Sequence, residues 1–395
     1  MAYINFKEEV YVAKEQLEKR LNNNEKLFND IKSSKKISNQ YNPDEKYSYK
    51  EFNESVFGGG RSKSEEEFKE ISNIDIVCTK FINCKFSNIK FTNCRFIGCY
   101  FIDNKFNGGG VVFEGCTFIK QESDAVPNLN KDDNLSCNFD GSSIYAKFLN
   151  CNLSHVIFNN CSLENINFET SDLTSVIIIN SNLSMPIIID SDLSGIKIVN
   201  TYIEDLEFRD KDKSKLDEKS FIDKIKFKYN TRDEYEGIYT VYEDIANKFQ
   251  NNNLKNNFGE YYFLCRKVQR KTLKPLPRLF SFLGFITCGY GERPSYTAYF
   301  GLFTIFIFSI LYLIFGIKVD GEIISYSKAF KNFEMRKFLT YYNESLNLSV
   351  GMIASVGLNE AQPAPASYML SNIEMLLGVF LNGIGIGALV KKIVR

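Results

Sequence analysis

The feature that most constrains this chain is a repeat of five residues between Ile76 and Phe208. Large apolar residues recur at this spacing in two runs. The first run consists of Phe81, Phe86, Phe91, Phe96, Phe101 and Phe106, and the second of Phe148, Leu153, Phe158, Leu163, Phe168, Leu173, Ile178, Leu183, Ile188, Leu193, Ile198, Ile203 and Phe208. A period of five matches neither the 3.6-residue period of a helix nor the two-residue period of a strand. The pattern therefore predicts stacked coils, which neither an amphipathic helix nor a hairpin sheet can provide.

Small residues stand two positions before these central residues. Seven of the ten cysteines occupy such positions, namely Cys84, Cys94, Cys99, Cys116, Cys137, Cys151 and Cys161. The combined pattern resembles the pentapeptide-repeat family. That resemblance implies a right-handed quadrilateral β-solenoid over residues 71–208, in which four repeats make one coil, the large residue fills the axis and the small residue fills the corner. We expect about six coils, a rod roughly 30 Å long and a polar loop inserted at about 119–136.

The outward positions of the solenoid carry information about partners. In the first run the residue before each centre is basic except at Tyr100, which argues against the acidic, DNA-like surface of some family members. We therefore expect no nucleic-acid partner. Ile157 and Ile177 are twenty residues apart and should stack on one outer face, where they form an apolar patch for the N-terminal segment or a neighbouring subunit.

Enzymatic chemistry has little support in the sequence. The cysteines form no CxxC pair, and the only histidine, His155, falls at an expected outward position of the solenoid. No nucleophile, base or metal-ligand set emerges. We expect a protein that is not an enzyme and that has no cofactor or bound metal.

Helices are expected on both sides of the solenoid. Within residues 1–70, a charged helix over residues 7–32 carries an apolar stripe formed by Val10, Leu17, Leu21 and Leu27, and a polar, irregular stretch follows. Residues 209–290 are expected to form a helical hairpin that links the solenoid to the last part of the chain. The N-terminal sequence alternates charges where a signal peptide needs an apolar core, so the N-terminal part should stay in the cytoplasm.

Two segments of residues 291–395 are long and apolar enough to cross a membrane. Residues 295–317 contain no charge and span about 35 Å as a helix, and residues 371–390 form the second segment. Basic residues precede the first segment and follow the second, so both termini should be cytoplasmic. The sequence thus predicts a multidomain, multi-pass protein of the plasma membrane.

The region between these two segments resembles a potassium-channel-like pore. A short pore helix is expected over 343–354, followed by Ser355, Val356, Gly357, Leu358, Asn359 and Glu360. These residues look like the filter sequence Thr-Val-Gly-Tyr-Gly-Asp, with Val356 and Gly357 retained. The resemblance implies a two-span, homotetrameric pore domain in the lipid bilayer with a re-entrant pore helix.

The departures from that filter bear on selectivity. In the family, backbone carbonyls at the positions of Ser355 to Leu358 would coordinate permeating K⁺ or Na⁺ transiently. Asn359 replaces the second filter glycine and Leu358 replaces tyrosine, so relaxed selectivity is expected. Glu360 would form a ring at the outer mouth. In the second span, Gly378 resembles a hinge glycine, Asn382 should face the lumen, and Gly383 and Gly387 should allow close helix packing.

Two functions follow from this sequence. The first is a tetrameric cation channel whose cytoplasmic solenoid regulates or scaffolds the pore and binds a protein or small-molecule regulator. The alternative is a membrane-anchored pentapeptide-repeat scaffold that binds a protein partner without conducting ions. The re-entrant segment separates the two, because an anchor needs no pore helix.

Overall fold

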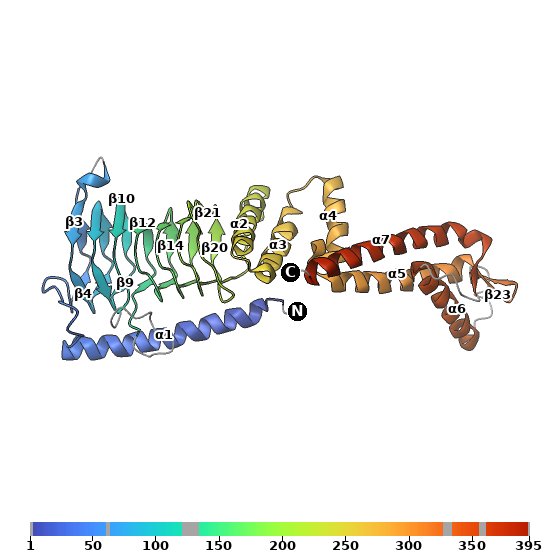
Figure 1. The fold of residues 1–395 in the computed structure, drawn as a ribbon, viewed down its shortest axis with the longest axis horizontal. Coiled ribbons are helices and arrows are strands. Elements are labelled where there is room, and N and C mark those ends of the chain that lie inside the picture. Colours follow the sequence, from blue (N-terminus) through green and yellow to red (C-terminus); the bar gives the residue numbers. More distant parts are fainter. Residues whose placement is uncertain (1–2, 61–63, 121–133, 327–333, 355–360, 394–395) are drawn as a thin grey trace. The chain divides into compact units, whose positions relative to one another are not determined.

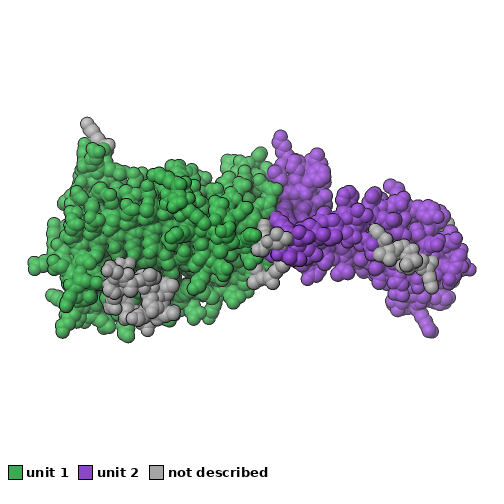
Figure 2. Space-filling view, viewed as in Figure 1, with its two compact units in different colours: residues 1–272 green, residues 273–395 purple. Residues whose placement is uncertain are grey.

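The computed structural model divides the chain into two compact units, Met1–Thr272 and Leu273–Arg395 (Figure 2). It describes residues 3–60, 64–120, 134–326, 334–354 and 361–393. The division falls inside the segment 209–290, which the sequence suggested as a linker.

The N-terminal unit contains a β-solenoid of about seven turns over residues 69–222, with two further strands before it at residues 51–58, and all of the strand pairs are parallel. One face consists of β1 (Glu51–Asn53), β5 (Lys80–Ile82), β9 (Tyr100–Ile102), β11 (Asn138–Asp140), β13 (Ile157–Asn159), β16 (Ile177–Ile179), β19 (Lys197–Val199) and β22 (Phe221–Ile222). The next face consists of β2 (Val56–Gly58), β6 (Lys85–Ser87), β10 (Lys105–Glu114), β12 (Ser143–Leu149), β14 (Ser162–Glu164), β17 (Asn182–Ser184) and β20 (Tyr202–Glu204).

Two further faces close the coil. The third contains β3 (Lys69–Ser72), β7 (Ile89–Thr92), β15 (Asn167–Glu169), β18 (Ile187–Ile189) and β21 (Glu207–Phe208). Strands β10 and β12 of the second face continue into this third face without a corner. The fourth face contains β4 (Asp75–Val77) and β8 (Arg95–Ile97), and then continues as single bridges from Thr117 to Lys215. Ile157 pairs with Ile177 and Ile177 with Lys197, so a complete coil takes twenty residues where the repeat is regular.

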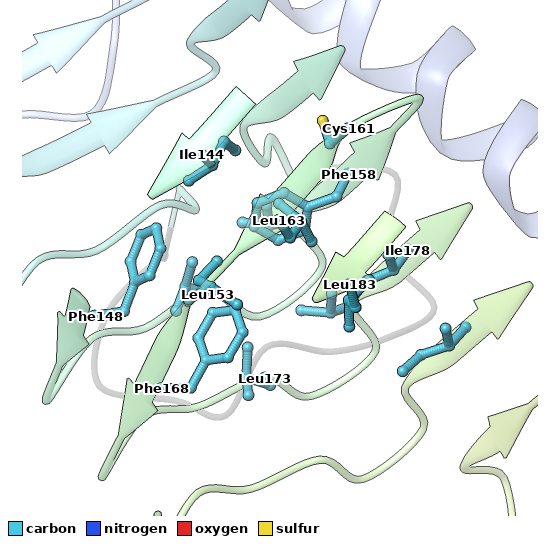
Figure 3. Close-up of a cluster of buried hydrophobic side chains, with 14 of the residues drawn as sticks. Ile144, Phe148, Leu153, Phe158, Cys161, Leu163, Phe168, Leu173, Ile178 and Leu183 are labelled. Carbon is cyan, nitrogen blue, oxygen red and sulfur yellow. The ribbon is translucent and has the colours of Figure 1, made fainter. Parts of the chain in front are cut away.

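The central residues stack along the axis of the solenoid. The ring centroids of Phe81 and Phe101 lie 5.0 Å apart, and those of Phe101 and Phe139 lie 4.4 Å apart. These separations match the spacing of paired strands, about 4.8 Å, so each ring lies on the ring of the next coil. Figure 3 shows how later coils replace some rings with aliphatic side chains such as Leu163 and Leu183.

Cysteine and serine fill the corners in the same way. Cys84 Sγ lies 3.4 Å from the carbonyl oxygens of both Ile82 and Phe52, and Ser171 Oγ lies 3.0 Å from the carbonyl oxygen of Glu169. The ten cysteines are free thiols. Burial raises the pKa of the Cys161 thiol to about 12, so this thiol is poorly suited to act as a nucleophile.

The solenoid begins earlier than the five-residue run at Ile76 suggested. Strands β1 and β2 pair with β5 and β6, and the ring of Phe52 stacks on that of Phe81 at 5.5 Å. The expectation of an irregular stretch before Lys69 was therefore wrong for residues 51–58. Tyr47, Phe52 and Phe57 already repeat at five residues, and this short run was the signal for the extra strands.

The long helix α1 (Phe6–Ser34) lies along the solenoid (Figure 1). Near its C-terminal end, Phe28 and Ile31 pack with Val77, Cys78 and Ile97 of the first coils. Near its N-terminal end, Ala13 packs with Ile177 and Val199 of the last coils. The outer apolar face predicted at Ile177 therefore does contact the N-terminal segment.

The helical hairpin covers the last coil of the solenoid and does not act only as a linker. Helices α2 (Arg232–Asn251) and α3 (Lys255–Gln269) bury an apolar face against the solenoid core. The hydroxyl of Tyr261 donates to the carbonyl oxygen of Ile222 at 2.9 Å and accepts from the Ile222 amide at 2.8 Å. The hairpin thus satisfies the exposed backbone edge that an open solenoid would leave.

In its described residues, the C-terminal unit contains four α-helices and two short 3₁₀ helices. They are α4 (Pro275–Cys288), η2 (Gly289–Gly291), α5 (Pro294–Phe315), α6 (Met335–Ala354) and α7 (Tyr368–Ile393), the last preceded by η3 (Pro365–Ser367). A small antiparallel sheet consists of β23 (Ile317–Val319), β24 (Glu322–Ile324) and β25 (Gln362–Pro363). Strand β25 pairs with β23 directly after residues 355–360.

Candidate pore segment and buried polar cluster

Helices α5 and α7 are long and apolar enough to cross a membrane, judged by length and composition. The sequence suggested 295–317 and 371–390 for the two spans, and the helices observed are Pro294–Phe315 and Tyr368–Ile393. In their most apolar windows, 28% of the α5 residues and 22% of the α7 residues are buried within the chain. Most of the residues in each apolar window are therefore not buried within the chain.

Helix α6 packs against both apolar helices. Its Leu348 is buried in a cluster with Phe308 and Tyr312 of α5, and Leu377 of α7 packs against the same cluster. The helix expected over 343–354 begins at Met335 and has 20 residues. Its first turns are held by aromatic contacts, in which the ring of Tyr326 lies 5.7 Å from that of Phe338. The sequence analysis placed the start of this helix at residue 343, because these tertiary contacts cannot be read from the sequence.

The predicted filter, Ser355, Val356, Gly357, Leu358 and Asn359, lies outside the described residues, as does Glu360. The chain on either side of it is well packed. Helix α6 ends at Ala354, and Ala361 is buried in the cluster around Leu348. After β25, the amide of Ala364 donates to the carbonyl oxygen of Gly316 at 3.3 Å, which ties the returning chain to the end of α5.

Gly378 is explained by a close approach of two helices. A methyl group added to Gly378 would lie 2.3 Å from the carbonyl oxygen of Ile353, so only glycine fits between α7 and the end of α6. Asn382 is exposed on the single chain. The close packing expected at Gly383 and Gly387 is not made within the described part of the chain, where both face open space. Gly385 instead lies against α5, and its added methyl group would be 3.2 Å from Thr297 Cγ2.

A buried polar cluster joins the three helices of this unit. The Tyr312 hydroxyl of α5 donates to Glu374 Oε2 of α7 at 2.8 Å, and Ser349 of α6 is hydrogen-bonded to Glu374 Oε1. Ser349 Oγ also lies 3.1 Å from the carbonyl oxygen of Ile305. The side chains of Ser349 and Glu374 have no exposed surface. Glu374 is the single charged residue of the span predicted at 371–390. This was the signal for the cluster, and the sequence analysis missed it.

A second feature missed in the sequence is the apolar surface of α4. This helix buries none of its residues and exposes Leu276, Leu279, Phe280, Phe282 and Leu283.

An ion pair holds the C-terminal end of α7. Lys391 Nζ lies 2.8 Å from the buried carboxylate of Glu292. An ion pair with one fully buried partner fixes the end of α7 against the turn between α4 and α5.

The N-terminal unit has a groove of about 580 Å³ between α1 and the solenoid. Arg20 Nη1 of α1 donates to the carbonyl oxygens of His155 and Ser175 at 3.0 and 2.8 Å. His155 lies at an outward turn of the solenoid, as the sequence predicts, but its side chain is buried beside α1. Burial, and then the charge of Arg20, lower its pKa to about 4. Among the described residues, no cluster of three histidine, cysteine or acidic side chains could hold a metal ion.

The basic residues that precede the centres of the first run are partly neutralised by neighbouring side chains. Arg95 Nε lies 2.6 Å from Asp75 Oδ1, and Lys90 Nζ lies 2.5 Å from Glu114 Oε2. Lys80 lies over the ring of Phe28, 5.3 Å from its centroid. Some of these basic residues therefore serve contacts within the N-terminal unit.

The comparisons with known proteins concern the solenoid. Residues 144–184 match the family described as pentapeptide repeats, in eight copies. A trypsin-treated form of QnrB1, a plasmid-mediated fluoroquinolone resistance protein, is 14% identical over 40% of this chain and 89% of its own, with a TM-score of 0.19. HetL, a pentapeptide repeat protein involved in heterocyst differentiation regulation from the cyanobacterium Nostoc sp. strain PCC 7120, is 10% identical over 40% of this chain and 88% of its own, with a TM-score of 0.14.

No curated protein matches the chain in sequence. The five-residue repeat, the four parallel faces and the family match agree with one another. The N-terminal unit therefore contains a pentapeptide-repeat β-solenoid domain, and the C-terminal unit is a helical region with two long apolar helices.

Proposed function

We propose that this chain is one subunit of a homotetrameric cation channel of the plasma membrane, with both termini and the solenoid in the cytoplasm. The observation that carries the proposal is the position of α6. This helix packs against both α5 and α7 and ends directly before the segment that resembles a filter. A simple membrane anchor would need only the two apolar helices.

The exposed surfaces of α5 and α7 support assembly. Side chains such as Phe303 on α5 and Phe380 on α7 are exposed by 60% and 66%. Gly383 and Gly387 add an open strip of small residues on α7, on which a second helix can approach closely. Four copies would bury part of this surface and bring four filter segments around one axis.

In this mechanism, ions pass along backbone carbonyl rings formed by Ser355 to Leu358, and no residue acts as a catalyst. Asn359, in place of the second filter glycine, favours passage of both K⁺ and Na⁺. Four Glu360 side chains would attract cations to the outer mouth. The solenoid would bias opening through a protein or small-molecule regulator, for which the groove beneath α1 offers a site.

A flux assay on full-length protein in liposomes tests the proposal. The wild-type protein should pass K⁺ and Na⁺, and Gly357→Val should abolish the flux because the larger side chain blocks the carbonyl path. Gly301→Ala on α5, where an added methyl group meets open space, serves as the matched control. Flux that survives Gly357→Val would remove the filter assignment. No flux in any variant would favour the alternative, a membrane-anchored pentapeptide-repeat scaffold.

A further inference from the structure

The buried cluster around Glu374 contains more acceptors than its hydroxyl hydrogens can serve if the carboxyl group is ionised. A serine hydroxyl has one hydrogen to donate. Ser349 Oγ nevertheless lies at hydrogen-bond distance from two acceptors, Glu374 Oε1 and the carbonyl oxygen of Ile305. An ionised Glu374 would leave one of these two contacts without a hydrogen.

A proton on Glu374 Oε1 removes this conflict. The carboxylic acid then donates to Ser349 Oγ, and the Ser349 hydroxyl donates to the carbonyl oxygen of Ile305. The Tyr312 hydroxyl donates to Glu374 Oε2 as before. Every polar atom of the cluster is then paired, and no charge is buried.

Among the described residues, the groups that contact Glu374 are hydroxyls, and none of them is a cation. Helix α5 contributes Tyr312, the one titratable group recorded in contact with this carboxyl group among the described residues, and α6 contributes the hydroxyl of Ser349. Apolar side chains of the same three helices, including Phe308, Leu348 and Leu377, form a cluster that also contains Tyr312. A buried carboxylate without a cation is unfavourable by several kcal/mol.

We propose that Glu374 is a proton-binding site whose neutral carboxylic acid fixes α6 against α5 and α7. Ser349 lies a little more than one helical turn before the last residue of α6, so this clamp sets where the chain leaves the helix. Glu374 is thus a positioning residue for the segment that begins at Ser355. Its protonation state stands independently, and only its effect on conduction rests on the proposed channel function.

Infrared difference spectroscopy of the full-length protein in lipid nanodiscs tests the protonation state. The spectrum of wild type minus Glu374→Gln at neutral pH should contain the carbonyl band of a protonated carboxylic acid. This band should shift in Ser349→Ala, because the acid loses its hydrogen-bond acceptor. A difference spectrum that contains only the paired bands of a carboxylate would overturn the proposal.

Substitutions test the positioning role. Glutamine reproduces the hydrogen bonds of the neutral acid, since its amide donates to Ser349 and its carbonyl oxygen accepts from Tyr312. Glu374→Gln should therefore keep the flux and the K⁺/Na⁺ ratio of wild type. Glu374→Ala should lower the flux on the order of ten-fold, because the buried hydroxyls of Ser349 and Tyr312 lose their partner.

The outcomes separate the two proposals. An acid band in a protein that conducts no ions keeps the proton site and removes the channel. Flux in a protein that shows only carboxylate bands keeps the channel and removes the proton site. Equal flux in the glutamine and alanine variants would contradict the positioning role.

Discussion

Single residues at the corners of the solenoid carry backbone conformations that most side chains avoid. At most turns of the coil, the residue two positions after the centre has positive φ, as at Asn83, Asn93 and Asn160. Asparagine tolerates the left-handed region better than most residues. His155 occupies such a corner at φ 63°, which explains its position in the repeat, and α1 then buries its side chain.

Acid should destabilise the N-terminal unit through His155. Its pKa falls from 6.5 to about 4 because the side chain is buried next to Arg20. The unfolded chain takes up a proton below about pH 6.5 and the folded chain does not until about pH 4, so stability is lost as the pH falls through this window, by up to roughly 3 kcal/mol. In His155→Asn, which suits the left-handed corner, this part of the pH dependence should disappear. Denaturant midpoints at pH 7 and pH 5, followed by circular dichroism of the full-length protein, measure it. Parallel pH profiles for the two proteins would contradict the prediction.

Gly378→Ala should disturb the C-terminal unit. The added methyl group would collide with the carbonyl oxygen of Ile353, so α6 and α7 must move apart, and we expect a loss of about 1–3 kcal/mol. Thermal unfolding in detergent measures this loss. Gly301→Ala is the control, because it adds the same group to a helix at an open position. Equal melting temperatures for the two variants would show that α7 does not lie against the end of α6.

At the scale of elements, α1 is a partner of the whole solenoid. Its contacts extend from Cys78 in the early coils to Phe221 in the last, and the amide of Asn24 donates to Ser136 Oγ between them at 3.1 Å. The apolar stripe suggested by the sequence included Val10, Leu17 and Leu27, which do pack on the solenoid. The buried Asn24 was not expected, because its partner is remote in the sequence.

Ile177→Asp should release the N-terminal half of α1. Ile177 is fully buried under this helix, and an unpaired carboxylate there would be strongly unfavourable. Hydrogen–deuterium exchange of residues 6–34 should rise in the variant while the solenoid strands stay protected. The matched control is Ile187→Asp, which introduces the same change on another face of the solenoid at a partly exposed position. Unchanged exchange in α1 would contradict its docking at Ile177.

At the scale of the molecule, the two units have separate cores. The largest cluster of buried side chains includes the solenoid axis together with α2 and α3, and a second cluster holds α5, α6 and α7 together. The hairpin belongs to the first unit because its apolar face completes the solenoid core. The sequence assigned it to a linker because amphipathic periodicity shows that a helix packs but does not show on what.

Residues 1–272 should fold as an independent domain. We expect a cooperative unfolding transition and the β-sheet circular dichroism of the solenoid. A shorter chain of residues 1–230, which lacks the hairpin, should aggregate, because the last coil would expose Ile222 and Ile225. Size-exclusion chromatography compares the two. A soluble, cooperatively folded 1–230 chain would show that the hairpin is not needed as a cap.

The sequence by itself determined the solenoid, because a five-residue period fixes which side chains lie on the axis and which lie at the corners. It also determined two apolar helices, since length and composition suffice for that assignment. Only the tertiary structure decided what covers Ile177, where α6 begins and which groups surround Glu374. Each of these depends on contacts between residues far apart in the chain, and local periodicity contains no information about such pairs.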